Sequence, residues 1–258
     1  MAKTALVTGA SSGIGAAYAR SLARDRYDLI LVARRADRLH ALAEELRSQH
    51  QVRVEVLPAD LLRPEAPDEL LEAVGTLGLQ VDLLVNNAGM GTHGPFLDQS
   101  AQDDQRMLAL NVAALVGLTR AFVAGMAARR TGAVINVAST AAFQPVPYFA
   151  VYAATKAFVL SYSEALAEEL RPFGVTVQCL CPGSTESEFV SVAQFKSDVP
   201  NKAPAMTAEA VVEESLSALR AGRAVHVAGV MNQLGALGPR FLPRWAITKI
   251  TALIFKPD

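Results

Sequence analysis

Short apolar runs alternate with longer segments along most of this chain. Runs such as Thr4–Val7 and Asp28–Ala33 have the length and composition of buried strands. Between the runs, apolar residues recur three and four positions apart, as Leu39, Leu42 and Leu46 do, which predicts amphipathic helices. The expected strands are 4–7, 28–33, 52–59, 81–85, 133–138, 174–180 and 224–227, and the expected helices are 16–23, 36–48, 64–77, 102–129, 148–170 and one that begins at Thr207 or Glu209.

This alternation continues without a change in composition that would mark a linker. It predicts an α/β fold with one doubly wound parallel sheet of about seven strands and helices on both faces. Residues 1–230 would form this single domain, and residues 231–258 an apolar and basic C-terminal extension packed on it. A ligand of such a sheet lies beyond the carboxyl ends of its strands. Chemically distinctive residues follow six of the expected strands: Gly9, Arg34, Asp60, Asn87, Ser139 and Pro182.

Composition excludes several classes of protein. The 258 residues are 51% hydrophobic and carry a net charge of −1, so a large core is expected and nucleic acid is not expected as a partner. Cys179 and Cys181 lie two apart in an apolar run, which predicts two reduced core cysteines on one face of a strand. The four histidines are scattered, so no metal site is predicted. The N-terminus lacks a signal-peptide pattern, and a cytoplasmic location is therefore expected.

A glycine-rich turn, Thr8–Gly15, follows the first strand and opens the first helix. Gly9 would let the chain reverse, Gly13 would let a pyrophosphate approach the backbone, and Gly15 would let the helix lie close to the strand. The free N–H groups of the helix would then attract an anion. A simple tight turn also needs glycine, so this motif alone leaves two interpretations open.

Further motifs complete a recognisable set. Asn86-Asn87-Ala88-Gly89, Asn111, Ser139, Tyr152-Ala153-Ala154-Thr155-Lys156 and Pro182-Gly183 follow the glycine-rich turn in order. In this order and spacing, the chain resembles the short-chain dehydrogenase/reductase family of the classical type over 3–229. The resemblance implies a Rossmann-type fold, a nicotinamide cofactor, and a homodimer or homotetramer.

The candidate catalytic residues are Asn111, Ser139, Tyr152 and Lys156. Tyr152 and Lys156 are four apart on an expected helix, so both project from one face, where the ammonium would lower the pKa of the phenol. Tyr152 would then exchange a proton with a carbonyl or an alcohol. The resemblance adds that Lys156 contacts the nicotinamide ribose, Ser139 holds the substrate oxygen, and Asn111 holds a water of the proton relay. Taken singly, the tyrosine and lysine could lie at the surface or core edge, and the serine could cap a turn.

Cofactor choice depends on the residues just after the second strand. NAD-dependent enzymes carry an acid there, whereas this chain has Ala33 followed by Arg34 and Arg35. A guanidinium suits a 2′-phosphate, so NADP(H) is predicted, with Arg34 favoured over Arg35, although both arginines could simply be solvated. By resemblance, Asp60 and Leu61 bind adenine, and Ser187 replaces a threonine that reaches the nicotinamide carboxamide. The complete predicted cofactor set is Gly9, Ser11, Ser12, Gly13, Ile14, Gly15, Arg34, Arg35, Asp60, Leu61, Asn87, Ala88, Gly89, Tyr152, Lys156, Pro182, Gly183 and Ser187.

These features predict an NADP(H)-dependent oxidoreductase that interconverts a ketone or aldehyde and an alcohol, on a hydrophobic small-molecule substrate. A 3-oxoacyl thioester reductase or a hydroxysteroid-type reductase is the narrower alternative, and a non-catalytic dinucleotide-binding regulator is the alternative of another class. Residues 184–202 are expected to form a substrate lid, in which Glu186 departs from the basic residue of similar chains. His93 could line the pocket, but a position in a surface loop is favoured.

The segment from Pro239 to Phe255 combines large apolar residues with Arg240, Arg244 and Lys249. It is too short and too charged for a convincing membrane span. Three interpretations compete, namely a cover over the substrate pocket, an oligomer contact and a membrane-surface helix. The first two are favoured together, and contact with a membrane is the less favoured interpretation.

Overall fold

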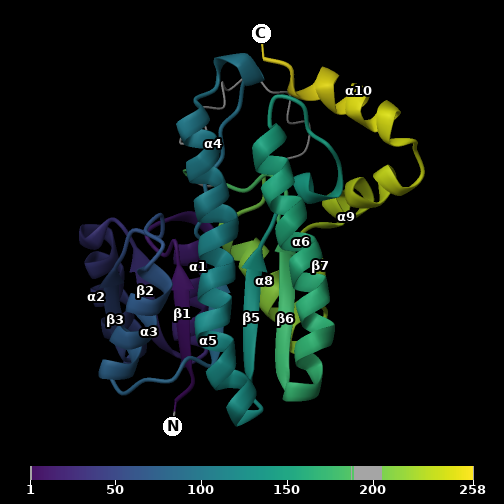
Figure 1. Cartoon of the computed structure of the whole chain (residues 1–258). Helices are drawn as coiled ribbons and strands as arrows, with labels where there is room; N and C mark the ends of the chain where they lie inside the picture. Colours follow the sequence, from purple (N-terminus) through teal and green to yellow (C-terminus); the bar gives the residue numbers. More distant parts are fainter. Residues whose placement is uncertain (1, 187, 189–204, 258) are drawn as a thin grey trace.

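The protein is built around one parallel sheet, seen in a computed structural model that describes residues 2–186, 188 and 205–257 (Figure 1). The sheet has seven strands in the order β3-β2-β1-β4-β5-β6-β7, and all neighbouring strands pair in parallel. This confirms the predicted fold class. The strands are β1 (Thr4–Thr8), β2 (Asp28–Ala33), β3 (Val54–Pro58), β4 (Leu83–Asn86), β5 (Gly132–Val137), β6 (Val175–Cys181) and β7 (Val225–Val227).

Helices cover both faces, because the central strands are apolar on both. Ala5 and Val7 of β1 pack on one face with α1, α2 and α8, whereas Leu6 packs on the other with α3 and α5. This period of two is what a strand requires. The helices are α1 (Gly13–Arg24), α2 (Ala36–His50), α3 (Ala66–Thr76), α4 (Ala101–Leu108), α5 (Leu115–Arg129), α6 (Ala150–Leu170), α8 (Ala208–Arg220), α9 (Val230–Leu237) and α10 (Arg244–Phe255).

The order of the strands reverses between β1 and β4. Successive strands lie on one side of β1 up to β3, and the chain then crosses to β4 on its other side. Loops from the two halves therefore separate at the carboxyl ends of β1 and β4, which leaves a crevice for a ligand. The glycine-rich turn and Asn87 lie at this position.

The chain departs from the expected elements in two places. The helix expected over 102–129 contains a π-helical turn, Ala109–Ala114, between α4 and α5. The other departure is α9, a separate helix in a segment for which none was expected. Both α9 and α10 lie beyond the carboxyl ends of β6 and β7, at the upper right of the molecule (Figure 1).

The two cysteines of β6 are buried and free, as predicted. Their Sγ atoms are 3.8 Å apart on neighbouring same-face positions, far longer than a disulfide bond.

Candidate active site

A cavity of about 640 Å³ lies over the carboxyl ends of the strands. Of the predicted residues, Gly15 and Asn111 lie behind its wall, and Ser187 lies outside the described residues. The remaining predicted residues all line the cavity: Gly9, Ser11, Ser12, Gly13, Ile14, Arg34, Arg35, Asp60, Leu61, Asn87, Ala88, Gly89, Ser139, Tyr152, Lys156, Pro182 and Gly183.

The glycine-rich turn is packed too closely to hold larger residues. Gly9 has φ +66°, and a Cβ there would lie 2.7 Å from Nδ2 of Asn87. A Cβ at Gly15 would overlap the carbonyl oxygen of Gly9. Asn87 fixes this contact, since its Nδ2 donates to the carbonyl of Thr8 at 2.9 Å and to that of Gly9 at 3.4 Å. The turn therefore brings the amino end of α1 against the cavity, where its N–H groups favour an anion.

Arg35 connects the end of β2 to this turn. Its guanidinium donates to Ser11 Oγ and Ser12 Oγ, both at 2.9 Å. Ser12 precedes α1 but makes no side-chain cap, and its hydroxyl accepts from Arg35 instead. Arg34, which the sequence favoured, lines the same cavity and is exposed. Both arginines thus border the cavity, and Arg35 is the one that hydrogen bonds hold against the glycine-rich turn.

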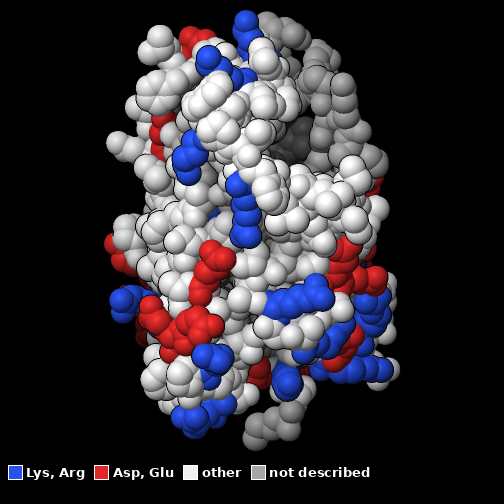
Figure 2. Space-filling model, turned by 90° about the vertical axis from the view of Figure 1, so that its right-hand side faces the viewer, with Lys and Arg blue, Asp and Glu red and all other residues white. Residues whose placement is uncertain are grey.

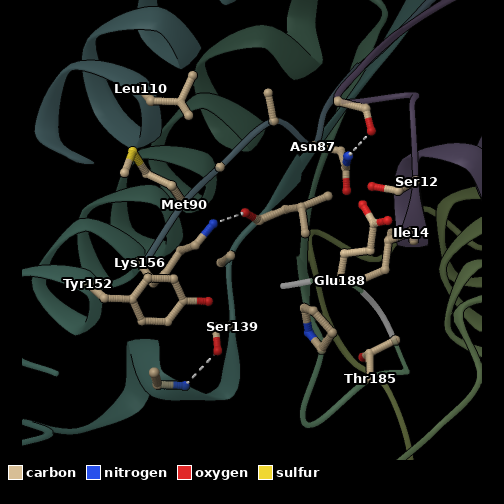
Figure 3. Close-up of a pocket in the computed structure, with 18 of the residues that line it drawn as sticks. Ser12, Ile14, Asn87, Met90, Leu110, Ser139, Tyr152, Lys156, Thr185 and Glu188 are labelled. Atoms are coloured by element: carbon tan, nitrogen blue, oxygen red, sulfur yellow. Dashed lines mark hydrogen bonds between the residues drawn. The ribbon is translucent and has the colours of Figure 1, made fainter. Parts of the chain in front are cut away.

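Glu188 brings a carboxylate to the same place. It accepts from Arg35 Nη1 at 2.9 Å and from Arg38 Nη1 at 2.6 Å. Hydrogen bonds from these two guanidinium groups lower the pKa of Glu188 to about 2, and the bond from Arg38 has the larger effect. Figure 3 shows Glu188 beside Ser12 and Ile14. The acidic character of this segment is visible in the sequence, but a role for Glu188 was not predicted from it.

At the other end of the cavity, Tyr152, Lys156 and Ser139 meet. The phenol and the amine project from one face of α6, and Lys156 Nζ lies 5.6 Å from the centroid of the Tyr152 ring. Ser139 follows β5 and hydrogen-bonds the Tyr152 hydroxyl, while its Oγ also accepts from the N–H of Ala141 at 3.1 Å (Figure 3). The serine therefore both caps a turn and faces the phenol.

The pKa of Tyr152 differs from the value expected from the sequence. Burial raises it to about 12, and the hydrogen bond with Ser139 offsets this only in part. Burial likewise lowers the pKa of Lys156 to about 8. The amine donates to the carbonyl of Val137 at 2.8 Å, away from the phenol oxygen. Desolvation therefore dominates the pKa of Tyr152, in place of the lowering expected from the neighbouring ammonium.

Asn111 lies on the π-helical turn and acts on the loop that follows β4. Its Oδ1 accepts from the N–H of Met90 at 2.9 Å, and its Nδ2 donates to the carbonyl of Met90 and to Thr155 Oγ1. A Cβ at Gly89 would lie 3.2 Å from Asn111 Oδ1 and 3.5 Å from Lys156 Nζ. The turn thus brings the amide close to the lysine, and π-helical turns are frequent at functional sites.

Several lining residues were not predicted from the sequence. Thr185 lies two positions after Gly183 and contributes a hydroxyl, and Gln144 contributes an amide whose Oε1 has no hydrogen-bond partner among the described residues. His93 does not line the cavity; it lies half-buried in the loop after β4, and its Nε2 contacts the carbonyl oxygen of Phe255 at 2.8 Å. The run of polar residues after Pro182 was the one sequence feature that could have indicated Thr185 as a lining residue. The apolar lining residues come from separate loops and helices: Met90, Leu110, Val146, Phe149, Ile254 and Phe255.

Comparison with known proteins identifies what this arrangement resembles. A family model described as short chain dehydrogenase matches residues 3–197. The chain is 33% identical over 227 residues to 17-beta-hydroxysteroid dehydrogenase type 3 of Mus musculus, covering 86% of this chain and 70% of that one. It is 29% identical over 250 residues to very-long-chain 3-oxoacyl-CoA reductase of the same species, covering 95% and 77%.

A solved structure gives the same result in three dimensions. A short-chain dehydrogenase from Sphingobium yanoikuyae in complex with NADPH is 37% identical, and the match covers 93% of each chain with a TM-score of 0.83. The NADP(H) prediction agrees with the cofactor in that structure.

These relatives correct one prediction. The cytoplasmic location expected from the N-terminus is wrong, because the likeness to these two mouse enzymes and one apolar helical stretch of the described chain stand against it. One helical stretch of the described chain, Ala101–Arg129, is also long and apolar enough to cross a membrane, although 39% of its most apolar window is buried within the fold.

Proposed function

Because the chain belongs to the short-chain dehydrogenase/reductase family and is an oxidoreductase acting on CH–OH groups, we propose that it reduces the carbonyl of an apolar substrate with NADPH. The observation that carries this proposal is a single cavity that joins an anion-binding turn at one end to Ser139, Tyr152 and Lys156 at the other.

The cavity fits an NADP(H) molecule by its chemistry. The uncapped amino end of α1 would receive the pyrophosphate, Arg34 and Arg35 the 2′-phosphate, and Asp60 with Leu61 the adenine. Bound NADPH would supply the hydride. The carbonyl oxygen would accept hydrogen bonds from Ser139 and Tyr152, and Tyr152 would deliver its proton to that oxygen. Lys156 would stabilise the phenolate that remains.

The apolar end of the cavity supports a hydrophobic substrate. Phe149 packs on the Tyr152 ring with centroids 4.4 Å apart, and Met90, Val146 and Phe255 continue the apolar surface. The free Oε1 of Gln144 would accept a hydrogen bond from an O–H or N–H of the substrate. A hydroxysteroid-type or 3-oxoacyl thioester carbonyl suits this lining, and the names of the two mouse relatives point to the same two classes.

The homodimer or homotetramer implied by the family resemblance stays a prediction.

A panel of carbonyl compounds tests this proposal. With NADPH consumption as the readout, a ketosteroid and a long-chain 3-oxoacyl thioester should react with kcat/KM at least about tenfold above that of a short polar ketone, because each buried methylene contributes about 0.8 kcal/mol. Equal values would contradict an apolar pocket. NADPH binding with no turnover on any compound would favour the non-catalytic alternative.

Reduction should slow as the pH rises through about 8, where Lys156 loses its proton. Below that pH the ammonium stabilises the charge that develops on the Tyr152 oxygen, and above it the neutral amine does not. Tyr152 itself stays protonated, because its pKa is about 12. The measurement is kcat/KM for NADPH between about pH 6 and pH 10.

Lys156→Arg provides the control for this pH dependence. A guanidinium keeps its charge over the whole range, so whatever activity the variant retains should show no fall near pH 8. A flat profile for the unmodified enzyme would show that Lys156 does not act in this way.

A further inference from the structure

The C-terminal part of the molecule exposes a large apolar surface. Residues 230–256, here termed the basic-apolar face, form α9, a short 3₁₀ turn (Gly238–Arg240) and α10. Phe241 is 84% exposed and Leu253 is 80% exposed. Monomeric soluble proteins rarely expose so many large apolar groups together unless something covers them. The other large apolar residues exposed on this face are Val230, Met231, Leu234, Leu237, Leu242, Trp245, Ile250 and Ile254.

The charges on this face all have one sign. Residues 230–256 include Arg240, Arg244, Lys249 and Lys256 but no Asp or Glu. None of the four bases forms an ion pair within the described chain, and Lys249 lies over the Trp245 ring at 5.5 Å. Figure 2 shows the region of α9 and α10 as mostly uncharged with separate basic groups, whereas acidic groups gather in the lower half of this view.

The exposed apolar residues and the unpaired bases together distinguish two partners that would cover the face, a second copy of the chain and a lipid surface. In a two-fold interface, a second copy would bring the same four cations against these four, which is unfavourable. An anionic lipid surface instead attracts each base, by about fivefold in binding, while Trp, Phe and Leu enter the boundary between headgroups and acyl chains. The face therefore complements a lipid surface better than it complements itself.

The face also adjoins the opening of the cavity. Ile254 and Phe255 at the end of α10 line the cavity, and Asn232 of α9 lines it too. Thr251 Oγ1 donates to the carbonyl of Pro145 at 2.9 Å, which fixes α10 beside the loop that follows Ser139. Anything that binds this face therefore lies next to the apolar end of the cavity.

We propose that the basic-apolar face docks on anionic lipid bilayers and so places the mouth of the cavity against the membrane surface. The docking itself does not depend on the proposed reaction. Its consequence for catalysis does rest on the proposed function, because an apolar carbonyl substrate that dissolves in the bilayer would then enter without crossing water.

Co-sedimentation with vesicles tests the docking. The purified full chain should pellet with vesicles of phosphatidylcholine mixed with phosphatidylserine, and less with phosphatidylcholine alone. Trp245→Glu with Leu253→Glu should weaken binding at least about tenfold, because two exposed anchors become anions. A triple variant that replaces three of the bases with glutamine should bind both kinds of vesicle equally. Its substitutions are Arg240→Gln, Arg244→Gln and Lys249→Gln.

Phe173→Glu is the matched control. Phe173 is 49% exposed, and it lies in the turn before β6, at the amino end of the strands and away from the face. This variant should bind vesicles like the unmodified chain, and an unchanged thermal unfolding midpoint should show that each variant folds. The proposal is overturned if the unmodified chain stays in the supernatant with both vesicles or if the glutamate pair binds normally. Conversion of a dimer to a monomer by that pair, without vesicle binding, would identify a second copy as the occupant.

Discussion

Replacing Tyr152 with phenylalanine should abolish NADPH-dependent reduction while leaving NADPH binding unchanged. The phenol is 7% exposed, hydrogen-bonds Ser139 and lies beside Lys156, so its removal deletes the proton donor without opening the cavity to a new group. A positioned acid contributes about 10²–10⁴-fold to such reactions, and we expect a loss of about a thousandfold in kcat. Stopped-flow measurement of NADPH oxidation and fluorescence titration of NADPH separate the two quantities.

Tyr148 offers a control for this prediction on the same segment. It precedes α6 in a left-handed conformation with φ +63°, and it does not line the cavity. Tyr148→Phe should therefore retain turnover within about threefold, as most surface changes do. Normal turnover by Tyr152→Phe, or an equal loss in both variants, would show that the proton comes from another group.

Replacing Arg34 and Arg35 together with alanine should weaken NADPH binding by about a hundredfold and leave NADH nearly unaffected. Charge-assisted hydrogen bonds to a phosphate contribute about 1.5–3 kcal/mol, and only NADPH carries the 2′-phosphate that would receive them. Titration of 2′,5′-ADP and 5′-AMP gives the same comparison without catalysis. The single variants should show a larger effect for Arg35, because it is the arginine held by Ser11 and Ser12.

Glu188→Gln is the reciprocal variant. It removes the carboxylate that pairs with Arg35 and Arg38, so NADPH should bind about threefold more tightly and NADH should not change. Glu186→Gln is the matched control, since that exposed carboxylate precedes Glu188 by two residues. Equal loss of NADPH and NADH binding in the double arginine variant would contradict a 2′-phosphate site.

Most of the fold follows from local pattern. The strands were predictable because parallel strands buried on both faces are nearly continuous apolar runs, as 28–33 and 175–181 are. The π-helical turn was not predictable from the sequence, since a single shift in backbone hydrogen bonding leaves the apolar spacing of 102–129 almost unchanged. The helix α9 was missed because 230–237 contains Gly235 and no charged residue to outline a polar face.

Most of the residues predicted for the site line one cavity, but their energetics could not be predicted. A spacing of four places Tyr152 and Lys156 on one face of a helix but does not show how deeply α6 is buried, so the raised pKa of the phenol could not be foreseen. Arg34 and Arg35 lie past the end of β2, where strand alternation no longer tells which side chain turns toward the glycine-rich loop. The contact of Glu188 with Arg35 joins residues far apart in sequence, which no local pattern reports.

The position of Glu188 has a consequence for how the enzyme responds to ionic strength. Because one carboxylate already offsets part of the charge of Arg35 and Arg38, the arrival of a phosphorylated dinucleotide would replace that anion with another. Few counterions are released from the protein in such an exchange, so salt screens the two competing anions alike. Discrimination between the phosphorylated and unphosphorylated dinucleotides would then persist over a wide range of salt concentrations, where solvent-facing arginines alone would lose it.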